Sequence, residues 1–122
     1  MNPNEYQTLA SRTEPGYESN VRSTLKLANE TNLELTHASF GIMSEAGEFA
    51  DALKKHIIYD KPLDVTNLKE ELGDLLWYIA LAHSALGINM EDTMQANIAK
   101  LKVRYPGKFT TGHASERLDK KG

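Results

Sequence analysis

Residues 68–86 read LKEELGDLLWYIALAHSAL, and this stretch decides the fold class. Its stripe residues recur every three or four positions, which is the spacing of one face of a helix. The stripe consists of Leu68, Leu72, Leu75, Leu76, Ile79, His83 and Leu86. Asp64 or Asn67 is suited to cap the start of this helix, and Gly87 is suited to end it. The sequence therefore predicts a long amphipathic helix here.

Helical spacing continues on both sides of this stretch. Before it, a helix is expected from about residue 33 to 58, on the apolar positions Leu35, Ile42, Ala46, Phe49, Leu53 and Ile57. Pro62 then ends that helix, because proline lacks an amide donor and disfavours helical geometry at the residue before it. After it, Asn89 reads as the cap of a helix that carries Met90, Met94, Ile98 and Leu101 and stops before Pro106.

The two ends of the chain are less regular. A short helix is predicted over residues 3–12, a loop over 13–20, and residues 21–32 combine a helical stripe with weak helix formers. No segment shows the alternation of a strand. We therefore expect an all-α fold, an antiparallel bundle of about four to five helices. The expected domain covers residues 1–109, and residues 110–122, with one large apolar residue, are expected to form a flexible tail.

Composition narrows the possible classes of protein. The 122 residues carry a formal net charge of −3, and the basic residues are dispersed, so long nucleic acid is not an expected partner. No apolar run approaches the roughly 20 residues that cross a bilayer, so no membrane span is expected. The chain has no cysteine, which excludes disulfides and thiolate metal sites, and MNPNEYQ does not resemble a signal peptide. These features indicate a cytoplasmic protein.

Two carboxylate doublets are the sharpest chemical feature. Glu45 and Glu48 lie on the first long predicted helix, and Glu71 and Asp74 lie on the second. A spacing of three residues directs both side chains of a doublet to one side of its helix. In neighbouring antiparallel helices the four carboxylates can converge into an oxygen-rich site of the kind that binds hard divalent cations. Each doublet borders apolar residues, where uncompensated carboxylates are costly.

The doublets and their surroundings resemble a known family. GIMSEAGEFADALKK (41–55), KEELGDLLWYIALAHSALGI (69–88) and NIAKLKVRYP (97–106) are similar to the MazG-type all-α nucleotide pyrophosphohydrolases. Their ExxE and ExxD motifs are filled here by the two doublets, with 22 residues between Glu48 and Glu71. The resemblance covers roughly residues 34–109, and NEYQTLASRTE (4–14) also resembles short, single-domain members.

The resemblance implies a function and a set of site residues. It implies a Mg²⁺-dependent enzyme, with Mn²⁺ as a possible substitute, that cleaves nucleoside triphosphates to a monophosphate and pyrophosphate by attack of water at the α-phosphate. Glu45, Glu48, Glu71 and Asp74 would be the catalytic metal ligands, and either Glu45 or Glu48 would orient or deprotonate the water. The implied substrate-binding residues are Lys54, Asn97, Lys100 and Arg104, and Trp77 would line a base pocket.

The resemblance also implies a homo-oligomer, either a dimer or a dimer-based tetramer, in which helices of two subunits complete the bundle. The sequence agrees, because the predicted helices carry apolar residues on more than one side, as with Ile79 and Trp77. A lone chain of this size is not expected to cover them. In such an assembly Lys100 or Arg104 would reach a neighbouring subunit's triphosphate.

The sequence also bears on three other possible functions. A di-iron site needs two Glu-x-x-His motifs, and only Glu34 with His37 forms one. A phosphate-binding glycine loop is absent, since PGKFTTG (106–112) does not match its pattern. The remaining alternative is a helical regulator or interaction module that binds nucleotide without hydrolysing it, although such a scaffold has no need of four converging acids.

Overall fold

The computed structural model describes residues 1–15, 26 and 28–120, and these form two units. The first unit covers residues 1–33 and the second covers residues 34–122. The predicted loop at 13–20 and the ambiguous segment at 21–32 lie largely outside the described residues. The two units are described separately below.

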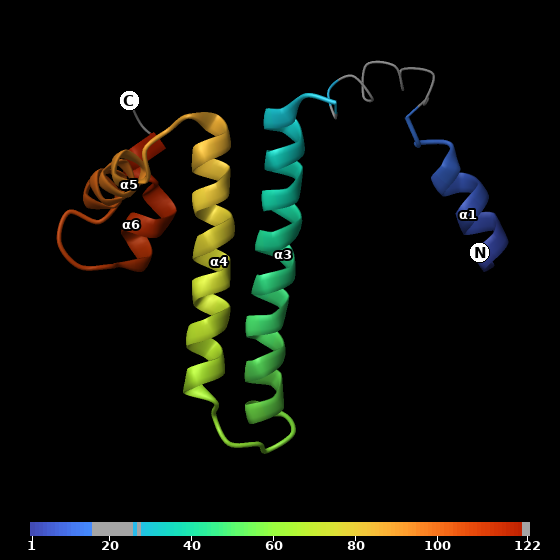
Figure 1. The fold of residues 1–122 in the computed structure, drawn as a ribbon, viewed down its shortest axis with the longest axis horizontal. Helices are drawn as coiled ribbons and strands as arrows, with labels where there is room; N and C mark the ends of the chain where they lie inside the picture. The colour runs from blue at the N-terminus through green and yellow to red at the C-terminus, as the bar shows by residue number, and fades with distance from the viewer. Residues whose placement is uncertain (16–25, 27, 121–122) are drawn as a thin grey trace. The chain divides into compact units, whose positions relative to one another are not determined.

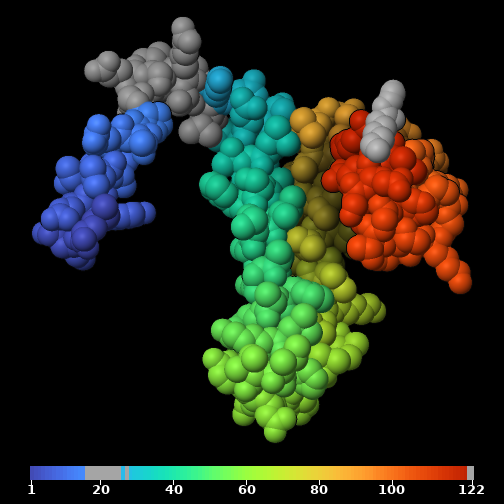
Figure 2. Space-filling model, turned by 180° about the vertical axis from the view of Figure 1, so that it is seen from behind, coloured from blue at the N-terminus to red at the C-terminus, as the bar shows by residue number. Residues whose placement is uncertain are grey.

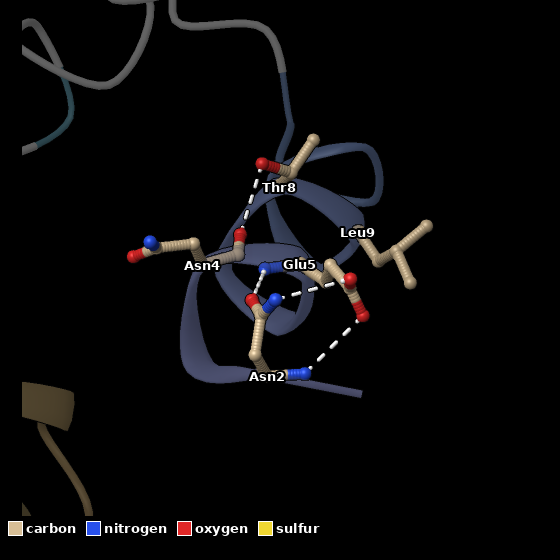
Figure 3. Close-up of a pocket in the computed structure, with 5 residues that line it drawn as sticks. All are labelled: Asn2, Asn4, Glu5, Thr8 and Leu9. Carbon is tan, nitrogen blue, oxygen red and sulfur yellow. Dashed lines mark hydrogen bonds between the residues drawn. The ribbon is translucent and has the colours of Figure 1, made fainter.

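The first unit contains helix α1 (Pro3–Ser11), in agreement with the short helix predicted there. Asn2 caps it, because its side-chain oxygen accepts a hydrogen bond from the backbone amide of Glu5 at 2.8 Å. The Glu5 carboxylate in turn accepts from the backbone amide of Asn2 at 3.2 Å, which completes a capping box (Figure 3). Asn2, Asn4, Glu5, Thr8 and Leu9 line a pocket on this helix. Hydrogen bonds join the polar groups of this pocket to one another, and those between Asn2 and Glu5 cap the start of the helix.

The second unit is built on two long antiparallel helices, α3 (Glu30–Ile57) and α4 (Val65–Leu86), which lie side by side (Figure 1). Local signals set the ends of α4. The Asp64 side chain accepts a hydrogen bond from the Asn67 amide at 3.0 Å, and Gly87 closes the helix with a φ of 66°. The prediction of antiparallel helices joined by a short loop is therefore confirmed.

Helix α5 (Met90–Arg104) follows, with Asn89 as its cap, as predicted. Beyond it the chain forms a short helix α6 (Thr111–Glu116) and a 3-10 turn η2 (Leu118–Lys120), which lie against α5 (Figure 2). The class is therefore all-α, and five helices are present among the described residues.

The expected flexible tail is thus largely helical, and an ion pair accounts for the difference. Arg104 on α5 donates from Nε and Nη2 to the two carboxylate oxygens of Asp119, at 2.8 and 2.9 Å. Only 2% of the Asp119 side chain is exposed, and the guanidinium of Arg104 holds the pKa of Asp119 well below its usual range. The sequence shows one large apolar residue in this segment, but it does not reveal this charged partner.

The described part of the chain has almost no interior. Among these residues only Ala38, Gly41 and Glu71 are buried, while Phe40, Met43, Leu76 and Trp77 are each more than half exposed. Met94, Ile98 and Val103 on α5 are exposed as well. Each long helix thus presents apolar side chains to solvent. None of the described helices is both long enough and apolar enough to cross a membrane.

The backbone of α3 at Gly41 lies directly against the ring of Tyr78 on α4. A Cβ atom built at Gly41 would overlap the ring of Tyr78, whereas one at Gly47 would meet no atom of the described residues within 4 Å. A glycine inside a helix can mark a close approach of another helix. Gly41 does so, whereas Gly47 has no such neighbour among the described residues.

We expect Gly41→Ala to lower the free energy of unfolding by roughly 1–3 kcal/mol, because the Tyr78 ring must move out of an occupied seam. Gly47→Ala is the matched control on the same helix. It should be neutral or stabilising by up to about 1 kcal/mol, since alanine favours helix more than glycine does. Urea unfolding followed by circular dichroism measures both, and equal effects would contradict the close packing at Gly41.

Candidate metal centre

The antiparallel pairing of α3 and α4 brings carboxylates from both helices together. Glu45, Glu71 and Asp74 each offer an oxygen, and these three oxygens lie within 4.8 Å of one another. The two acids on α4 share a face because they are three residues apart. Glu48 lies one turn further along α3, and its charge contributes to raising the pKa of Glu71. Three of the four acids of the predicted doublets therefore meet in one acidic cluster, and Glu48 lies beside it.

Glu71 is the most constrained member of this cluster. It is 9% exposed, and its Oε2 atom and the Oε2 atom of Glu45 are buried without a hydrogen-bond partner. The neighbouring Glu45 carboxyl, burial and the charge of Glu48 raise the pKa of Glu71 to about 7. A buried carboxylate without a partner is costly, so the cluster is poised to take up a positive charge.

The donor atoms fit a hard divalent cation. All the nearby ligand atoms are carboxylate oxygens, which Mg²⁺, Mn²⁺ and Ca²⁺ prefer over nitrogen or sulfur. The two buried oxygens without partners provide the observation that points to a ligand rather than to a solvated helix face. Glu45, Glu71 and Asp74 are the residues that would hold the ion, and Glu48 lies close enough to Glu71 to take part.

An aromatic pocket adjoins the acids on one side. Glu45 and Asp74 line it together with Trp77 and Tyr78, whose rings meet edge to face at 5.0 Å between centroids. His37 lies behind them, 5.6 Å from the Tyr78 ring and 6.4 Å from the Trp77 ring. Trp77 is 59% exposed, so a flat ligand has access to its ring. The sequence pointed to Trp77 as a pocket residue, whereas His37, which is distant from it along the chain, was considered only as part of a di-iron motif.

A polar pocket adjoins the acids on the other side. It is lined by Glu48, Asp51, Ala52, Lys55, Asn67 and Glu71. Asp51 pairs with the ammonium group of Lys55 at 3.1 Å and with that of Lys54 at 3.4 Å. Sequence analysis assigned no role to Lys55 and considered Asn67 only as a helix cap. Lys55 and Asn67 meet because α3 and α4 are antiparallel, which places the end of α3 beside the start of α4.

The structure does not bring the other predicted substrate-binding residues to these pockets. Lys54 lies over the ring of Tyr59, 5.9 Å from its centroid, and lines neither pocket. Asn97 and Lys100 are exposed on α5, and Arg104 is held by Asp119. Within one chain these residues therefore stay apart from the acidic cluster, and their role remains a prediction.

Comparison with known proteins identifies relatives of this arrangement. Residues 34–109 match the family described as the MazG nucleotide pyrophosphohydrolase domain. The chain is 36% identical over 88 residues to the Gene 37 protein of Mycobacterium phage L5, which covers 68% of this chain and 76% of the phage protein. It is 34% identical over 73 residues to the uncharacterized protein YvdC of Bacillus subtilis (strain 168), covering 52% of this chain and 69% of YvdC. No solved structure is significantly similar to it.

The raised pKa of Glu71 predicts an unusual pH dependence of stability without metal. A carboxyl whose pKa is higher in the folded state than in the unfolded state stabilises the fold at low pH, and this contribution is lost as the pH rises from about 4.5 through about 7. With chelator present, Glu71→Gln should therefore melt higher than wild type near pH 8 and similarly near pH 5.

Magnesium should abolish that difference at about pH 8 by stabilising wild type, because a ligand that binds only the folded state raises its stability by mass action. Differential scanning fluorimetry with and without Mg²⁺ measures both effects. Parallel melting curves for the two proteins at all pH values, unchanged by Mg²⁺, would rule out a charged cluster that binds the ion.

Proposed function

Because the chain belongs to the MazG nucleotide pyrophosphohydrolase family, we propose that it hydrolyses nucleoside triphosphates to a nucleoside monophosphate and pyrophosphate. The observation that carries this proposal is the cluster of Glu45, Glu71 and Asp74, which lies in the region matched to the family. One oxygen each of Glu45 and Glu71 is buried there without a hydrogen-bond partner. The metal in the proposal is Mg²⁺, with Mn²⁺ able to substitute, since both accept an all-oxygen site.

The proposed reaction divides into steps for which the chain supplies groups. Bound divalent cations supply positive charge that neutralises the phosphate oxygens and acidifies water. Glu45, Glu48, Glu71 and Asp74 hold the cations, and either Glu45 or Glu48 receives the proton of the attacking water. The water oxygen bonds to the α-phosphorus, and the bond from that phosphorus to the oxygen bridging to the β-phosphate breaks. The products are the monophosphate and pyrophosphate.

The aromatic pocket is the proposed place for the nucleoside. Trp77 is exposed beside Asp74, so a base has room to stack on its ring. Tyr78 lies edge-on to that ring and lines the pocket with it, and His37 contacts the Trp77 ring edge-on. Lys54, Asn97, Lys100 and Arg104 remain proposed contacts of the substrate, and Arg104 must first release Asp119 to serve there.

We propose that the working form is a homo-oligomer, a dimer or a dimer-based tetramer. The described residues bury almost no large apolar side chain, and exposed apolar residues on α3, α4 and α5 are suited to cover those of another copy. In such an assembly the exposed residues Asn97 and Lys100 can come from the neighbouring subunit to the acidic cluster.

Glu48→Gln and Asp74→Asn should each lower the rate of pyrophosphate release by more than tenfold, or about 1.4 kcal/mol of activation free energy, because each removes a ligand charge while keeping the volume. The assay measures pyrophosphate formed from a panel of ribo- and deoxyribonucleoside triphosphates with Mg²⁺. Circular dichroism confirms that the variants keep their helices.

Glu70→Gln is the matched control, since it removes an exposed acid next to Glu71 that lines neither pocket. It should keep near wild-type activity. Release of no pyrophosphate by wild type from any nucleotide of the panel would reject the enzyme and leave the nucleotide-binding regulator as the function. Activity above a tenth of wild type in Asp74→Asn would remove that residue from the metal site.

Light scattering should give a solution mass of twice or four times 13.6 kDa, as a dimer or a dimer-based tetramer requires. Leu76→Glu, which places a charge in the exposed apolar face of α4, should lower both the mass and the activity, because the neighbouring subunit no longer completes the site. Glu70→Lys changes charge on another side of α4 and should alter neither. A fully active 13.6 kDa monomer would contradict the shared bundle.

A further inference from the structure

The two pockets at the acidic cluster lie on opposite sides of it along the axis of the helix pair. On α4 the aromatic pocket uses Trp77 and Tyr78, which follow Glu71 and Asp74, whereas the polar pocket uses Asn67, which precedes them. Because α3 runs in the opposite direction to α4 (Figure 1), Lys55 near the end of α3 lines the same pocket as Asn67 near the start of α4. The seam between the helices therefore carries aromatic rings at one end, acids in the middle, and the ion pair of Lys55 and Asp51 at the other end.

The chemistry of the polar pocket suits an anion that is already bound to cations. Glu48 and Glu71 line its inner side, and they belong to the proposed metal ligands. Glu71 is nine-tenths buried, and its Oε2 atom is buried without a hydrogen-bond partner. An isolated phosphate would be repelled by these acids, but a phosphate that shares their metal ions would not.

Lys55 supplies the positive charge at the outer side of this pocket. Its ammonium group is held 3.1 Å from Asp51, and both side chains are largely exposed, at 63% and 45%. An exposed ion pair of this kind is weak and exchanges readily. Asp51 thus acts as a positioning residue that keeps Lys55 near the pocket and gives way when a more highly charged anion arrives.

We propose that this polar pocket receives the pyrophosphate leaving group, with Lys55 and the side-chain amide of Asn67 as its protein contacts. The inference rests on the proposed function and adds a direction to it. The triphosphate lies along the seam, with the nucleoside toward Trp77 and the β- and γ-phosphates toward Lys55.

Charge and length both favour this direction over its reverse. The departing pyrophosphate carries most of the negative charge of the products, and the aromatic pocket offers no cation in the residues that line it. Lys55 lies seven residues after Glu48, a rise of about 10 Å along the helix. A lysine side chain of roughly 6 Å and a diphosphate group together span that distance.

The test compares inhibition by the two products in wild type, Lys55→Gln and Lys55→Arg. Lys55→Gln should weaken inhibition by pyrophosphate about tenfold, or about 1.4 kcal/mol, and change inhibition by the nucleoside monophosphate less than about twofold. Lys55→Arg should restore pyrophosphate inhibition, because arginine also binds phosphate. Lys69→Gln, which removes an exposed ammonium group of α4 that does not line the pocket, is the matched control.

Calorimetry of pyrophosphate with Mg²⁺, without any nucleotide, provides a measurement that does not depend on turnover. Loss of binding in Lys55→Gln alone would support the pocket even if wild type hydrolysed no nucleotide, which would reject only the proposed function. Hydrolysis by wild type together with unchanged pyrophosphate binding in Lys55→Gln would overturn the pocket and leave the function standing. Weaker inhibition by the monophosphate instead of pyrophosphate would reverse the direction of the substrate.

Discussion

Mutual repulsion of carboxylates across the seam between α3 and α4 is the constraint on which the rest of the structure depends. Helices that carry facing acids pack closely only when protons, cations or bonded partners offset the charge. The pKa of Glu71 is raised to about 7, so a proton taken up there would offset part of this charge. The same seam keeps Gly41 against Tyr78, so the backbones stay close where the acids begin. A cation bound at the proposed site would therefore also favour close packing of the two helices.

The small number of buried apolar side chains has the same cause. A seam filled with acids, glycine and lysine buries little apolar surface, so hydrophobic stabilisation has to come from other faces of the helices. Those faces carry Met43, Leu76 and Ile98, which solvent reaches in the single chain. In the proposed function the polar seam serves chemistry and the apolar outer faces serve assembly. A fold divided in this way would couple the oligomer to the site, although the two use different side chains.

Local signals in the sequence predicted much of this architecture. Asp64, Gly87 and Asn89 end or cap their helices because each acts on backbone groups only a few residues away. The meeting of Glu45 with Glu71 and Asp74 was also predictable, since three-residue spacing and antiparallel pairing suffice. The sequence did not reveal partners that meet only through the register, such as His37 with Tyr78 or Lys55 with Asn67. Arg104 differs from these residues, because the sequence assigned it to the substrate. In the structure it is bonded to Asp119, which the apolar periodicity of the helices does not single out.

The pairing of Arg104 with Asp119 has a consequence for how this chain can change during evolution. The family's matched region ends at residue 109, yet the second structural unit continues past it and depends on a carboxylate ten residues further on. Loss of Asp119 by mutation would leave a partly buried guanidinium without its partner, and loss of Arg104 would strand a buried acid. The two positions are therefore expected to be inherited as a pair, so the C-terminal extension and the last helix of the domain evolve together.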